Sequence, residues 1–194
     1  ISHDLRTPLT RMKLQLALIK DKNLIERFSS DIDEMEKMLN EYLQFSRTGA
    51  EDKTETFNLS NFIENIIQKY ENTNILLDFN QKIYFNGRKN LIQRCISNLI
   101  DNSLKYGRKI IVKIEKQKSN IILSIDDDGP GIPESEYPNI IKPFYKIDKS
   151  RSDSKSSVGL GLAITSDIIK SHGGDIDFDR SNLGGLKVKI SLPA

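Results

Sequence analysis

Apolar residues recur at alternating steps of four and three through residues 5–42. The first series is Leu5, Leu9, Met12, Leu16 and Ile19, and the second, after a polar turn at residues 20–23, is Ile25, Phe28, Ile32, Met35, Leu39 and Tyr42. This is the heptad pattern of helices that pack on other helices, and it predicts an antiparallel helical hairpin over residues 1–47. Because one hairpin buries both apolar seams poorly, we expect two chains to form a dimeric four-helix bundle.

The pattern changes after residue 47. Residues 48–56 are polar and have no apolar period, so they are expected to form a linker in which Gly49 ends the second helix. Further on, the pattern predicts helices at 59–71, 90–106 and 165–171 and strands at 75–79, 83–85, 110–115, 121–126, 176–178 and 186–192. This order predicts an α+β two-layer sandwich with a mostly antiparallel sheet over residues 57–194.

Composition narrows the possible classes of function. A length of 194 residues with 37% hydrophobic content suffices for ordinary cores, and a net charge of +2 gives no general case for nucleic acid or anionic membrane as partner. The single Cys95 lies in an apolar run and is expected to be a buried structural thiol. No zinc cluster is visible in the sequence, and no apolar run is long enough to span a bilayer. The chain starts inside a helical pattern without Met, which suggests a fragment.

The first ten residues, ISHDLRTPLT, place a histidine beside a carboxylate. His3 lies roughly 150° from the centre of the apolar seam, on the outer face of the helix. Thr7 lies one turn further on that face, and Asp4 can contact the imidazole from the side. Pro8 cannot bond to the carbonyl of Asp4, so a bend is expected there. His3 is the expected site of modification, although such a pair taken alone is more often an ordinary solvated pair.

A polar face is predicted on the helix that contains NLIDNSLKYG. The residues at neighbouring positions on this face are Asn98, Asn102, Lys105 and Tyr106. Amide oxygens suit Mg²⁺, a lysine suits phosphate, and a tyrosine ring offers a flat surface to a base. A helix with polar surface decoration explains this motif equally well.

Next along the chain, DDDGPGIP follows a predicted strand directly. Gly129 and Gly131 allow a close approach of the backbone, and an aspartate at the end of the strand can accept a hydrogen bond from an adenine amino group. By itself this motif is also compatible with a plain acidic turn.

A second pair of glycines opens a helix in SSVGLGLAI. The amides after Gly159 and Gly161 would form an anion site at a helix N-terminus. Before them, residues 142–157 begin with Phe144 and Tyr145 and continue as serine and charge, which is typical of an anchored lid.

The order of these motifs resembles the catalytic core of sensor histidine kinases of two-component signalling, over nearly the full length of the chain. The likeness is closest to the EnvZ type of osmolarity sensor and rests on residues 2–11, 45–49, 126–132, 159–164 and 184–193. It implies a dimerisation and histidine phosphotransfer hairpin at 1–47 and an ATP-binding domain of the GHKL (Bergerat) type at 57–194. It also implies that the chain is the cytoplasmic portion of a bacterial inner-membrane protein.

The resemblance implies a role for each residue of the His motif. His3 would accept the γ-phosphoryl group of ATP, Asp4 would assist by orienting the ring and taking its proton, and Thr7 would serve dephosphorylation of the partner. The partners would be a second copy of the chain and a response regulator of the OmpR-like type.

The resemblance also implies the nucleotide and metal ligands. Asn102 would be the principal Mg²⁺ ligand, helped by Asn98, and Asp127 would read the adenine, with Asp126 and Asp128 as less favoured neighbours. The remaining expected ATP contacts are Lys105, Tyr106, Gly129, Gly131, Lys146, Arg151, Gly159, Leu160 and Gly161. Arg151 could equally be a solvated lid residue.

One position departs from the family pattern, because Ser157 stands where these kinases commonly have another glycine. Two alternatives remain: a GHKL-type ATPase without histidine phosphotransfer, which would share the asparagine and glycine motifs, and a catalytically weak signalling scaffold, which Ser157 supports.

Overall fold

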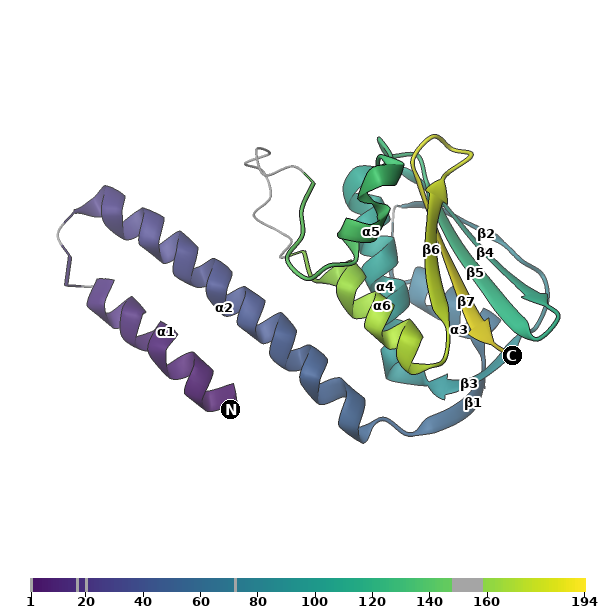
Figure 1. Ribbon diagram of the computed structural model, residues 1–194, viewed down its shortest axis with the longest axis horizontal. Coiled ribbons are helices and arrows are strands. Elements are labelled where there is room, and N and C mark those ends of the chain that lie inside the picture. Colours follow the sequence, from purple (N-terminus) through teal and green to yellow (C-terminus); the bar gives the residue numbers. More distant parts are fainter. Residues whose placement is uncertain (1, 17, 20, 72, 148–158) are drawn as a thin grey trace. The chain divides into compact units, whose positions relative to one another are not determined.

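The computed structural model describes residues 2–16, 18–19, 21–71, 73–147 and 159–194. The chain divides into two compact units, the first reaching Ala50 and the second beginning at Glu51 (Figure 1). The domain boundaries expected after residues 47 and 56 stay a prediction. Within the described ranges, no helix has the length and apolar character needed to cross a membrane.

The first unit is a hairpin of α1 (Ser2–Leu16) and α2 (Lys22–Glu51). The residues that bury its seam are Leu9, Leu16 and Ile32, with Ile19 and Leu39 packed against them. Beside the seam, the Nζ atom of Lys13 on α1 lies 2.8 Å from Asp33 and 2.7 Å from Glu36 on α2. The hydrogen bond to Asp33, followed by that to Glu36, raises the pKa of Lys13. The heptad pattern therefore predicted the hairpin correctly, and five of its apolar positions pack together within it.

The prediction that Gly49 ends the second helix is wrong. Helix α2 continues through Gly49 to Glu51. A glycine inside a helix costs about 1 kcal/mol relative to alanine, which one position in a 30-residue helix can absorb. Part of the expected linker is also a strand, because β1 (Thr54–Asn58) pairs antiparallel with β3 (Tyr84–Arg88). Its anchor is Phe57, which is buried opposite Phe85.

The second unit is built around a five-stranded sheet with the order β2-β4-β5-β7-β6. Its strands are β2 (Asn74–Asp78), β4 (Lys109–Gln117), β5 (Asn120–Asp127), β6 (Asp175–Arg180) and β7 (Leu186–Pro193). Only the β2–β4 pair within this sheet is parallel. This confirms the predicted α+β class and the mostly antiparallel sheet.

Helices cover one face of this sheet, as Figure 1 shows for α3 (Leu59–Ile67), α4 (Lys89–Tyr106) and α6 (Gly161–Ser171). Two short helical turns that the sequence pattern did not predict, η1 (Glu134–Glu136) and α5 (Tyr137–Ile140), lie between β5 and α6 in the chain. Cys95 on α4 is 1% exposed, and burial raises the pKa of its thiol to about 12. The expected buried structural thiol is confirmed.

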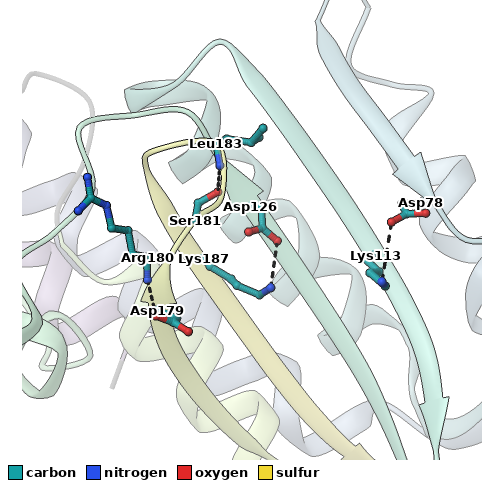
Figure 2. A network of polar contacts seen from close by, with 8 residues as sticks. All are labelled: Asp78, Lys113, Asp126, Asp179, Arg180, Ser181, Leu183 and Lys187. Carbon is teal, nitrogen blue, oxygen red and sulfur yellow. Dashed lines mark hydrogen bonds and ion pairs between the residues drawn. The ribbon is translucent and has the colours of Figure 1, made fainter.

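The other face of the sheet carries charged side chains. Figure 2 shows Asp78 of β2 beside Lys113 of β4, with 3.9 Å between Oδ2 and Nζ. It also shows Asp126 of β5 beside Lys187 of β7, with 3.8 Å between Oδ2 and Nζ. The two faces of β5 therefore differ: one packs under the helices and the other carries polar and charged residues.

A histidine joins the end of α6 to the start of α4. The backbone N–H of Arg88 donates to Nε2 of His172 at 3.0 Å. Nδ1 of His172 must then carry the ring proton, and it donates to the carbonyl of Ile168 at 2.8 Å. The ring also packs on Phe85, with 5.8 Å between centroids. Burial lowers the pKa of His172, because the charged form loses solvation there.

Acidification is expected to destabilise the second unit through His172. Since the pKa of His172 in the folded chain lies below the 6.5 of the unfolded chain, its stabilisation is complete above 6.5 and is lost as the pH falls toward the folded-state pKa. The protonated ring cannot accept from Arg88, and loss of that hydrogen bond costs about 1 kcal/mol. Chemical denaturation at about pH 7.5 and about pH 5 measures the change. In His172→Gln, which does not titrate, the drop in stability should be smaller; an equal drop in both proteins contradicts the prediction.

Candidate functional site

The carboxylate of Asp127 lies buried where β5 ends. Asp127 is 4% exposed, and its Oδ1 accepts hydrogen bonds from the N–H groups of Gly129 and Leu186, each at 3.0 Å. Its backbone carbonyl accepts from the N–H of Gly185 at 3.1 Å. Within the described part of the chain, Oδ2 of Asp127 accepts no hydrogen bond. It can therefore accept one from a ligand N–H, such as the amino group of adenine.

The two neighbouring aspartates have other roles. Strand alternation places Asp126 on the opposite face of β5, where it pairs with Lys187 (Figure 2). Asp128 turns to the backbone after α4, and its Oδ1 accepts from the N–H groups of Arg108 at 2.6 Å and Lys109 at 2.9 Å. The hydrogen bond from Lys109, followed by that from Arg108, lowers the pKa of Asp128. Among these three carboxylates, the geometry thus favours Asp127 as the adenine reader.

Glycines allow three segments to meet around Asp127. A Cβ on Gly129 would lie 3.0 Å from the carbonyl oxygen of Tyr106, at the end of α4. A Cβ on Gly185 would lie 2.1 Å from Oδ1 of Asp127 and 2.5 Å from the amide of Gly129. Gly131 has a φ of +71°, in the left-handed region. Sequence reasoning missed Gly185 as a site residue; the signal for it is the glycine pair directly before an apolar strand.

The end of α4 supplies the flat surface expected for a base. Tyr106 is 50% exposed, and Nζ of Lys105 lies 5.2 Å from the centroid of its ring. An exposed aromatic ring with a neighbouring ammonium suits a planar group that bears phosphate. The backbone carbonyl of Tyr106 lies beside Gly129, and the expected contact of the Tyr106 ring with a base stays a prediction.

The other end of the site lies between α4 and α6. Nδ2 of Asn98 donates to the carbonyl of Gly161, the first residue of α6, at 3.3 Å. Asn102, one turn further along α4, is half-buried, and its side chain makes no hydrogen bond with the residues that the structure describes. From Asn98 to Tyr106, α4 rises about 12 Å. The helix therefore carries the residues expected to contact phosphate and those expected to contact adenine on different turns.

The asparagines and the start of α6 fit Mg²⁺ and phosphate. The amide oxygens of Asn98 and Asn102 are hard ligands of the kind that Mg²⁺ accepts together with water. The first N–H groups of α6 have no intrahelical partner, and a helix N-terminus favours anions. Before α6, Gly159 has a φ of +80° and Leu160 is 5% exposed, so Leu160 anchors the segment rather than offering its side chain to a ligand.

The structure describes only some of the remaining expected site residues. Arg151 and Ser157 lie outside the described residues. His3 and Asp4 belong to the first turn of α1, but their side chains are likewise outside the described part. Thr7 is exposed on α1, which continues through Pro8, and Lys146 is half-buried just before the undescribed segment.

Two family models match the chain. Residues 87–194 match the model described as "Histidine kinase-, DNA gyrase B-, and HSP90-like ATPase", and residues 1–51 match the "His Kinase A (phospho-acceptor) domain". The first match contains α4, Asp127, Gly185 and α6, and the second contains the hairpin.

Curated relatives align with the whole chain. It is 34% identical over 200 residues to the sensor histidine kinase GtrS of Pseudomonas aeruginosa, covering 100% of this chain and 40% of that protein. It is 32% identical over 209 residues to the sensor histidine kinase CpxA of Escherichia coli, covering 100% of this chain and 45% of that protein. The chain thus spans less than half the length of these relatives. The narrower likeness to the EnvZ type stays a prediction.

Solved structures share the fold. The Acinetobacter baumannii histidine kinase AdeS superposes with a TM-score of 0.64 at 23% identity, over 100% of this chain and 98% of that one. The catalytic domain of histidine kinase ThkA gives a TM-score of 0.62 at 24% identity, over 73% of this chain and 97% of that one. At these identities the likeness establishes the fold only.

Asp127→Asn is expected to weaken adenine-nucleotide binding at least about 10-fold while the protein stays folded, because an amide N–H at the Oδ2 position opposes the donor of the base. Calorimetric titration with an ATP analogue measures the loss, and thermal unfolding checks the fold. Unchanged affinity in a folded Asn variant would remove Asp127 from the site.

Gly185→Ala and Gly161→Ala form a matched pair. The new methyl at position 185 meets a carboxylate and two backbone atoms within 2.5 Å, so unfolding should become easier by at least about 1–3 kcal/mol. At position 161 nothing lies within 4 Å, and alanine favours the helix, so stability should be equal or higher. Denaturation midpoints compare the two variants; equal destabilisation would show that the space around Gly185 does not matter.

Proposed function

Because the chain belongs to the sensor histidine kinases, we propose that it binds Mg-ATP in its second unit, phosphorylates itself on His3, and passes the phosphoryl group to an aspartate of a response regulator. The observation that carries this proposal is the constellation of Asp127 with its glycines at one end of α4 and Asn98 with the start of α6 at the other. The match of residues 1–51 to a phospho-acceptor domain supports His3 as the acceptor.

In the proposed first step, the unprotonated ring nitrogen of His3 attacks the γ-phosphorus. A P–N bond forms as the bond from the γ-phosphorus to the bridging oxygen breaks, and ADP leaves with the electron pair. The ring becomes cationic, and Asp4 takes or polarises the proton on its other nitrogen. Most of the rate comes from holding the reacting groups in line and neutralising charge.

The chain's own residues have separate tasks at the nucleotide. Asp127 and Tyr106 hold the base, while Lys105, Lys146 and the N-terminus of α6 offer positive charge or N–H groups to phosphate. Mg²⁺, held by Asn102 and Asn98 with water, supplies charge neutralisation when bound. Arg151 is a further proposed phosphate contact.

The regulator is proposed to dock on the hairpin near His3. Helical spacing puts Leu14 of α1 on the same stripe as the position of His3, and Leu14 is 67% exposed. Leu18, which follows the end of α1 at Leu16, is 83% exposed. Exposed apolar residues near a reactive position favour a protein partner. Thr7 lies on this stripe too, which supports its proposed role in the reverse, phosphatase reaction. An OmpR-like regulator is the proposed partner class.

Dimerisation is proposed through the residues of the heptad seam that the hairpin leaves uncovered. Met12, Phe28 and Met35 belong to the two apolar series, yet they are 43%, 47% and 49% exposed. A second copy of the hairpin would bury them in a four-helix bundle.

The cellular location forms part of the same proposal. We infer that the chain is the cytoplasmic portion of a longer protein of the bacterial inner membrane, from its likeness to sensor kinases more than twice its length. A GHKL ATPase without histidine transfer is not favoured, because such an enzyme does not require the phospho-acceptor hairpin at residues 1–51.

Incubation with γ-labelled ATP and Mg²⁺ is expected to label the protein in an acid-labile, alkali-stable form, because phosphohistidine contains a P–N bond. His3→Gln should abolish the label while retaining affinity for an ATP analogue, since the acceptor is distinct from the nucleotide ligands. Label that persists in His3→Gln would refute His3 as acceptor. Steady ATP turnover without phosphoprotein would instead favour the plain ATPase.

A further inference from the structure

Two stretches of backbone between α5 and α6 contact each other, one at Phe144 and Tyr145 and the other at Gly159. The N–H of Phe144 donates to the carbonyl of Gly159 at 3.0 Å. A Cβ on Gly159 would lie 3.0 Å from the carbonyl oxygen of Tyr145 and 3.2 Å from the carbonyl carbon of Phe144. The backbone at Phe144 and Tyr145 is therefore in contact with the backbone at Gly159. We call these three residues the neck.

The conformation of the neck is unusual for its residue types. Phe144 has a φ of +64°, although it is neither glycine nor asparagine. Its side chain is 55% exposed, so burial of the ring does not explain this conformation. Bulky residues remain in this region only when neighbouring contacts hold them, and such positions concentrate at functional sites.

The contact that holds the neck comes from η1. The hydroxyl of Tyr145 donates to Oε2 of Glu136 at 2.5 Å, and Nδ2 of Asn139 donates to the same oxygen at 3.2 Å. Nζ of Lys142 in turn donates to Oδ1 of Asn139 at 2.7 Å. The hydrogen bond from Tyr145 lowers the pKa of Glu136, so the carboxylate stays ionised and accepts throughout the neutral range.

The neck is continuous with the phosphate end of the site. Gly159 is followed by the buried Leu160, whose carbonyl accepts from the N–H of Ile164 at 2.9 Å inside α6. Gly161 follows, and its carbonyl accepts from Asn98 at 3.3 Å. A displacement of Gly159 would thus move the first amides of α6 and the side chain of Asn98 together.

We propose that Tyr145 and Glu136 are positioning residues for the phosphates of the nucleotide. Their hydrogen bond holds the neck, and the neck fixes Gly159 to Gly161 against Asn98. Neither side chain is proposed to touch the nucleotide. The inference rests on the proposed function, and it adds that the neck sets the geometry of the phosphate contacts.

Tyr145→Phe removes the hydroxyl and keeps the ring. Affinity for a non-hydrolysable ATP analogue and the kcat of autophosphorylation should each fall about 10-fold, because misplacement of the phosphate contacts costs this much. Affinity for adenosine should remain unchanged, since Asp127 reads the base at the other end of α4. A role in stability alone would weaken neither ligand, or would weaken both alike.

Two variants of Glu136 test whether the hydrogen bond between Tyr145 and Glu136 is the cause of the defect. Glu136→Ala should reproduce the defect, and adding Tyr145→Phe to it should cause no further loss, because the hydrogen bond between the two side chains is already absent. Glu136→Gln, whose amide oxygen can still accept from Tyr145, should recover most of the affinity. Additive losses, or a Gln variant as poor as the Ala variant, would overturn the proposal.

The control is Tyr70→Phe, which also loses a tyrosine–carboxylate bond, from the Tyr70 hydroxyl to Asp101 at 2.9 Å, but outside the neck. It should bind the ATP analogue as the unmodified chain does. An unmodified chain that neither binds the analogue nor labels His3 would refute the proposed function itself. An active chain in which Tyr145→Phe binds and reacts normally would refute only the positioning role.

Discussion

The buried carboxylate of Asp127 is the contact on which the proposed nucleotide site depends. One oxygen satisfies two amides from different segments, Gly129 in the loop and Leu186 in β7. Because buried amides without partners are costly, this carboxylate joins the end of β5, the following loop and the start of β7. Gly185 packs so closely on it that no side chain fits there. The adenine end therefore takes its shape from the central strands of the sheet.

The two ends of the site are built from different kinds of structure. Strands and tight glycine contacts form the adenine end, where backbone positions are determined by the ladder of the sheet. The proposed phosphate end contains single side-chain hydrogen bonds, from Asn98 to Gly161 and from Tyr145 to Glu136. Base recognition would thus persist while the phosphate contacts adjust, which suits the proposed uptake of ATP and release of ADP.

Local patterns predicted those parts of the structure that local chemistry decides. Heptads predicted the hairpin, and the alternation along β5 distinguishes Asp127 from its neighbours once the direction of the core is known. Contacts between residues distant in the sequence could not be predicted. Arg88 and His172 are 84 positions apart, and neither local sequence indicates that the two residues form a hydrogen bond. Gly49 was misjudged for a related reason, since a glycine ends a helix only if the residues after it leave the helix.

The junction between α2 and β1 has a kinetic consequence. Only Asp52 and Lys53 separate the two elements, and Oδ1 of Asp52 already accepts from Asn90 at 2.7 Å. In the proposed phosphoryl transfer, so short a tether would keep bound nucleotide at an effective concentration on the order of millimolar around the hairpin, whatever the dilution of the protein. The proposed transfer within one assembly would then be first order in protein.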